Sequence, residues 1–95
     1  MSIFFKAESA FLIHGRGMIL AGTVLDGMAS RGMSVQIDGF PRQLLVDGIE
    51  HISTDDQRLN VIGLLFQSSD PEELKLWRSL DVEEKVFKLY AAEEL

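Results

Sequence analysis

The segment from Phe11 to Gly27 constrains the fold of this chain more than any other, because it has the pattern of two apolar strands joined by Gly15-Arg16-Gly17. Glycine readily adopts the positive φ angles that a tight connection between strands requires. We therefore expect an antiparallel hairpin with Arg16 near its tip. Gly22, in the middle of the second strand, indicates a bulge or a close approach of two backbones.

Segments on both sides of this hairpin alternate side chains at period two, the pattern of a strand with one buried face. Residues 3–14 form the first such segment, and residues 33–38 form the second. In the first segment, the face that we expect to be buried consists of Phe5, Ala7, Ser9, Phe11 and Ile13. In the second segment it consists of Met33, Val35 and Ile37.

Two further apolar segments follow. Residues 42–53 predict a strand, or a bulged pair of strands with a kink at Asp47-Gly48, and their core candidates are Leu45, Ile49 and Ile52. Residues 59–66 form a dense apolar run, which is typical of a central strand covered on both faces. About six strands with glycine-rich connections predict a mainly all-β fold, a small antiparallel barrel that forms a single domain over residues 1–95.

The last third of the chain carries helix signals. Asp70-Pro71-Glu72-Glu73 combines an N-cap, a proline at the first helical position and acids in the first turn, which predicts a short helix through about Trp77. Asp81 begins a second capping pattern, followed by apolar residues at helical spacing, so we favour a second short helix within residues 82–94. Residues 85–90 also alternate as a strand would, and that alternative stays open. We expect four aromatic residues to lie in the core or to plug the barrel: Phe40, Phe66, Trp77 and Tyr90.

A spaced set of glycines and strand residues runs through residues 11–39. Its members are Phe11, Ile13, Gly15, Arg16, Gly17, Gly22, Val24, Gly27, Gly32, Val35, Ile37 and Gly39. This pattern resembles the second, β-barrel domain of translational GTPases of the elongation factor Tu kind. The resemblance covers about residues 8–76 and implies a barrel of the translation-protein type. No Gly-x-x-x-x-Gly-Lys-Ser/Thr loop occurs in the sequence, so we assign no GTP binding.

The resemblance also implies a ligand. In elongation factor Tu this barrel helps to cradle the terminal adenosine of aminoacyl-tRNA, and the matching positions imply a binding site here. These positions are Glu8, Ile13, Gly15, Arg16 and Glu50, together with Leu64 or Leu65. The sequence departs from the family at Ser53, where the family has an arginine, and at residues 77–80. Arg16 therefore has two interpretations: it bonds loop carbonyls and locks the barrel, which we favour, or it meets a ligand.

The charge distribution points to a protein partner. The net charge is −6, and residues 49–95 carry all of the excess, because they contain five basic and eleven acidic side chains. Nucleic-acid binding requires a cationic surface, so a nucleotide or the 3′ acceptor end of a tRNA is only the alternative ligand. We interpret the chain as a non-enzymatic binding module of the immunity-protein or adaptor type, for which a basic protein is a candidate partner. The interaction candidates are Glu72, Glu73, Glu83 and Glu84.

Other chemistry is not indicated. The chain has no cysteine, and neither His14 nor His51 stands at a convincing metal-ligand spacing from a carboxylate. We therefore expect no metal, no cofactor and no catalytic residues. The first residues lack the basic segment of a secretion signal, and the short apolar run there is interrupted by Lys6 and Glu8. We expect a cytoplasmic protein that does not associate with a membrane.

Overall fold

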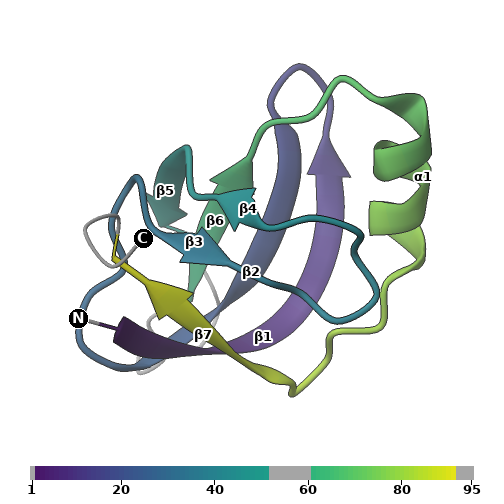
Figure 1. Ribbon diagram of the computed structural model, residues 1–95. Helices are drawn as coiled ribbons and strands as arrows, with labels where there is room; N and C mark the ends of the chain where they lie inside the picture. Colours follow the sequence, from purple (N-terminus) through teal and green to yellow (C-terminus); the bar gives the residue numbers. More distant parts are fainter. Residues whose placement is uncertain (1, 52–60, 92–95) are drawn as a thin grey trace.

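The computed structural model describes residues 2–51 and 61–91 of the chain. These residues form a mainly β structure with one short helix, as the sequence predicts (Figure 1). The elements are β1 (Ser2–Ile13), β2 (Gly17–Asp26), β3 (Ser34–Val35), β4 (Leu44–Leu45), β5 (Gly48–His51), β6 (Ile62–Phe66), α1 (Pro71–Ser79) and β7 (Val86–Tyr90). Among the described residues, no helix has both the length and the apolar character needed to span a membrane.

The seven strands form one curled antiparallel sheet in the order β4-β3-β7-β1-β2-β6-β5. Its two outermost strands, β4 and β5, are separated in the sequence by only Val46 and Asp47. The Val46 N–H donates to the Met33 carbonyl and the Asp47 N–H to the Leu65 carbonyl, both at 2.8 Å. Residues 44–51 thus supply both outermost strands of the sheet, because they pair with β3 before Val46-Asp47 and with β6 after it, next to the kink or turn predicted at Asp47-Gly48. The sheet therefore closes into a barrel-like shape (Figure 1).

The predicted hairpin is confirmed. β1 and β2 pair from Phe4–Asp26 to Ile13–Gly17, and both glycines of the corner have positive φ, 81° at Gly15 and 121° at Gly17. The close approach at Gly22 is also confirmed, because a Cβ atom there would overlap the Lys6 carbonyl oxygen and lie 2.8 Å from the Phe5 ring.

A bulge in β1 overturns part of the predicted buried face. Phe5 and Ala7 are buried as expected, but the register with β2 shifts between Ala7 and Ser9. One extra residue on a strand moves every later side chain to the opposite face. Ser9 is therefore exposed, and Ala10 and Leu12 pack against the core where Phe11 and Ile13 were expected.

At residues 44–46, the buried positions are likewise shifted by one residue from the predicted ones. Met33, Val35 and Ile37 are buried as predicted. Leu45, predicted as a core residue, is 59% exposed, whereas the side chains on either side of it, Leu44 and Val46, are buried. Ile49 is partly buried against the core, as expected, and Ile52 lies outside the described residues.

The helix α1 begins and ends close to the predicted positions. The Asp70 side chain accepts a hydrogen bond from the Glu72 N–H at 2.9 Å, and Pro71 occupies the first helical position. Trp77 is completely buried and packs edge-on against Phe40 and Phe66, each with ring centroids 5.7 Å apart. These three aromatic residues lie in the core as predicted. The prediction for Tyr90 is wrong, because that ring is 36% exposed.

The favoured second helix is wrong over residues 86–90, which form strand β7 between β1 and β3. Phe87 and Leu89 point into the core, and the alternate residues face outward. The acidic residues taken as a helix start form a turn, in which the Lys85 N–H donates to the Val82 carbonyl at 3.0 Å. As a strand, this segment forms backbone hydrogen bonds with both of its neighbours, β1 and β3. A helix would leave the backbone groups of those two strands without these partners. The remainder of the predicted helix, residues 92–94, lies outside the described residues.

Candidate functional site

A groove lies between the tip of the β1–β2 hairpin and helix α1. Its larger part is a cavity of about 730 Å³, and an adjoining hollow of about 570 Å³ shares Leu12, Leu74 and Arg78 with it. We call the two together the hairpin–helix groove. The lining residues that matter below are Leu12, Ile13, Arg16, Leu74, Lys75 and Arg78.

Trp77 fixes the helix against the hairpin and so sets the shape of the groove. Its indole Nε1–H donates to the carbonyls of Phe11, at 3.1 Å, and Ile19, at 3.2 Å, which face each other on β1 and β2. Leu74 and Arg78 are four residues apart, so they occupy one face of α1, and both line the groove. The two walls are therefore held in a fixed relation by a buried side chain.

The lining of the groove is basic, although the protein as a whole is acidic. Arg16 and Arg78 line the larger part, Lys75 and Arg78 line the smaller one, and His14 lies at the hairpin end. No aspartate or glutamate of the described residues lines either part. The remaining lining is largely apolar, so the groove suits a ligand that combines negative charge with an apolar group.

Arg16 is held by Glu50 of β5, with which it forms an ion pair. The arginine side chain is 53% exposed and the glutamate 27% exposed. Among the described residues, the guanidinium contacts the Glu50 carboxylate and donates to no loop carbonyl. The arginine instead ties the hairpin tip to β5 and keeps an exposed edge at the groove.

The residues implied by the resemblance are only partly brought together. Ile13, Gly15 and Arg16 line the groove, and Glu50 stands beside Arg16. Glu8 is exposed at the β1 bulge and does not line it. Sequence reasoning missed Leu74, Lys75 and Arg78. The i, i+4 spacing of Leu74 and Arg78 was a signal for a shared helix face, but nothing in the sequence indicates that this face meets the hairpin.

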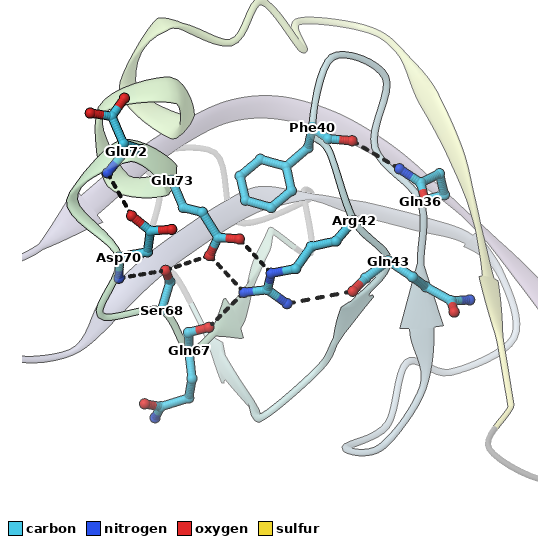
Figure 2. Close-up of polar contacts among 9 residues, drawn as sticks. All are labelled: Gln36, Phe40, Arg42, Gln43, Gln67, Ser68, Asp70, Glu72 and Glu73. Carbon is cyan, nitrogen blue, oxygen red and sulfur yellow. Dashed lines mark hydrogen bonds and ion pairs between the residues drawn. The ribbon is translucent and has the colours of Figure 1, made fainter.

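The predicted interaction residue Glu73 takes part in an internal cluster with Arg42 (Figure 2). The Arg42 Nε and Nη2 atoms donate to the two carboxylate oxygens at 2.6 and 2.9 Å, and the Ser68 hydroxyl donates to Oε1 at 2.6 Å. The hydrogen bonds from Arg42 and then from Ser68 lower the pKa of Glu73 to about 2. Arg42 Nη2 also donates to the Gln67 carbonyl at 3.3 Å, so the cluster ties α1 to two loops.

The other predicted interaction residues do not form one surface with Glu73. Glu72 is exposed at the first turn of α1, whereas Glu83 and Glu84 are exposed in the turn before β7. Glu72 lies in the first turn of α1, whereas Glu83 and Glu84 follow its last residue, Ser79. A helix of this length spans about 13 Å, so the carboxylates make two separate groups.

Within residues 2–51 and 61–91, no group of three or more histidine, cysteine, aspartate or glutamate side chains could hold a metal ion. The candidate site is the hairpin–helix groove, which is lined by arginine, lysine and apolar side chains. Comparisons with protein-family models, with curated proteins and with solved structures find no match to this chain.

Proposed function

We propose that this domain is a non-enzymatic protein-interaction module whose hairpin–helix groove binds an acidic segment of a partner protein. One observation carries the proposal: a protein with a net charge of −6 lines the hairpin–helix groove with Arg16, Arg78 and apolar side chains, and with no carboxylate of the described residues. Glu50 already pairs with Arg16, so the positive charge that the groove offers to a negatively charged ligand comes from Lys75 and Arg78.

The two walls have different roles in this proposal. Arg78 and Lys75 on α1 would pair with carboxylates of the segment, since the Arg16 guanidinium already contacts Glu50. Leu12, Ile13 and Leu74 would accept an apolar side chain placed next to those carboxylates. The ligand is thus an acidic peptide with a neighbouring leucine, isoleucine or phenylalanine. The exposed carboxylates of Glu72, Glu83 and Glu84 would additionally steer a partner that carries a basic region elsewhere.

A second candidate is the 3′ end of an RNA, as the resemblance to elongation factor Tu domain 2 implies. The observation in its favour is that Ile13, Gly15 and Arg16 line the groove, with Glu50 alongside. A terminal phosphate could pair with Arg78, and the apolar wall could receive a base. We place this candidate second because an RNA strand carries a phosphate at every nucleotide, and outside the groove these phosphates would meet a protein with a net charge of −6.

Anisotropy titrations with two labelled probes test the proposal and separate the candidates. One probe is a peptide of glutamate and leucine residues, and the other is a tRNA acceptor-end mimic that ends in adenosine. We expect the peptide to bind, and we expect Arg78→Glu to weaken that binding by about tenfold or more, as for the loss of a close charge pair. Arg31→Glu is the matched control, because Arg31 is exposed and lies outside the groove.

The outcomes are distinct. Peptide binding that is weakened by Arg78→Glu but not by Arg31→Glu supports the protein-interaction function. Binding of the RNA mimic with the same dependence on Arg78 supports the second candidate in its place. Equal effects of both substitutions, or no binding of either probe to the unsubstituted protein, would contradict the groove as the site.

A further inference from the structure

The outer face of strands β7 and β1 exposes large apolar side chains far from the groove. Phe4 is 47% exposed, Val86 51% and Tyr90 36%. Register places them together, because Phe4 pairs with Lys88 and is therefore diagonal to both Val86 and Tyr90. These three side chains expose apolar surface around Lys88, which makes this face a candidate interface.

A row of three residues across neighbouring strands gives this face a definite charge pattern. Lys88 of β7, Phe4 of β1 and Asp26 of β2 lie side by side, because Phe4 is in register with both of the others. All three are exposed. The Lys88 ammonium lies 5.0 Å from the centroid of the Tyr90 ring, which holds the lysine over the sheet face. The row thus reads cation, aromatic ring, anion.

We propose that this face binds a second copy of the same chain, around a two-fold axis that runs along β1 over Phe4. Such an axis exchanges the two sides of β1 and leaves β1 itself in place. It would therefore set Phe4 against Phe4 of the second copy. It would also set Lys88 of each copy against Asp26 of the other, which gives two equivalent ion pairs around a central aromatic contact.

The neighbouring exposed residues of β1, Lys6 and Glu8, lie along the axis, so each faces its own counterpart, as Phe4 does. Lys6 of one copy meets Glu8 of the other only diagonally. The direct charge complementarity of the face therefore comes from Lys88 and Asp26. Single-stranded nucleic acid, the other occupant that exposed aromatic rings between lysines could suit, requires an excess of cations that this face lacks.

Sedimentation velocity of the full chain tests the assembly. We expect the unsubstituted protein to sediment as a dimer once its concentration is raised to about 0.5 mM. Phe4→Asp should sediment as a monomer at the same concentration, with an unchanged circular dichroism spectrum. Because Phe4 is already half exposed, the substitution leaves the core intact. A monomeric unsubstituted protein, or a dimer that survives Phe4→Asp, would overturn the proposal.

A charge exchange tests the axis itself. Lys88→Glu and Asp26→Lys should each sediment as monomers, because each creates two like-charge contacts in its own dimer. An equimolar mixture of the two should form a dimer, since every facing pair is then of opposite sign. Glu72→Lys, which reverses a carboxylate away from this face, is the control and should remain dimeric. If the mixture stays monomeric, or if Asp26→Lys dimerises better because it lowers the net negative charge, the proposed axis is wrong.

Discussion

At the scale of single residues, the described part of the chain contains one non-glycine residue with a positive φ, Glu84 at 63°. It occupies the third position of the turn from Val82 to Lys85, and its N–H donates to the Ala7 carbonyl at 2.8 Å. A side chain in the left-handed region strains the backbone. The turn keeps this strain because it begins the pairing of β7 with β1.

Glu84→Gly should stabilise the protein. Glycine removes the strain at positive φ, although it costs entropy in the unfolded chain, so we expect a net gain of about 0.5–1 kcal/mol. Urea unfolding measures the gain. Glu83→Gly is the matched control in the same turn, and it should not stabilise, because Glu83 does not have a positive φ. Equal effects at the two positions would contradict the role given to the backbone of Glu84.

The ion pair of Arg42 with Glu73 should make stability depend on pH in the acid range. The pKa of Glu73 is lowered in the folded protein to about 2 from its usual 4.5, so the folded state favours the carboxylate. This contribution is fully present above pH 4.5 and is lost as the pH falls toward 2. Glu73→Gln should therefore lower stability at neutral pH, and the difference from the unsubstituted protein should shrink across that range. A difference that is constant with pH would show that the carboxylate charge contributes nothing.

At the scale of elements, the sequence predicts what local chemistry decides. The glycine corner at residues 15–17 and the cap at Asp70 are both found where predicted, because each depends on neighbouring residues only. β7 is different. Its residues fit a helix or a strand, and the choice depends on pairing with β1, about 80 residues away. The β1 bulge likewise leaves no local signal, and the groove depends on where Trp77 docks.

The offset at the kink gives a paired prediction for β4. Leu44 is buried and Leu45 is 59% exposed, although the two are adjacent and identical. Leu44→Ala should lower the free energy of unfolding by about 2–5 kcal/mol, the range for truncating a core leucine. Leu45→Ala should change it by less than about 0.5 kcal/mol. Denaturant unfolding of both variants checks the register, and comparable losses would mean that the strand is placed one residue out.

At the scale of the whole molecule, closure of the barrel-like sheet depends on very short strands. β3 and β4 each contain two residues, yet the N–H groups of Val46 and Asp47 join opposite ends of the sheet. Buried side chains from every part of the sheet form one core cluster, which includes Val46. We call residues 44–51 the closing segment. We infer that it opens only when the whole domain unfolds, because separating it would expose that shared core.

Hydrogen exchange with a distant variant tests this cooperativity. Gly22→Ala would place a methyl group against the Lys6 carbonyl and the Phe5 ring, on the side of the sheet formed by β1 and β2. We expect this variant to lose about 1–3 kcal/mol of stability by overpacking. Gly48→Ala is the control, since its nearest contact would be an ordinary 3.5 Å from Leu65. In Gly22→Ala, the opening free energies of the Val46 and Asp47 amides should fall by the same amount as those of β1. Two results would show that the closing segment opens independently of the core. In Gly22→Ala, the two amides would keep their original protection while the amides of β1 lose theirs. In the unsubstituted protein, the two amides would exchange faster than those of β1.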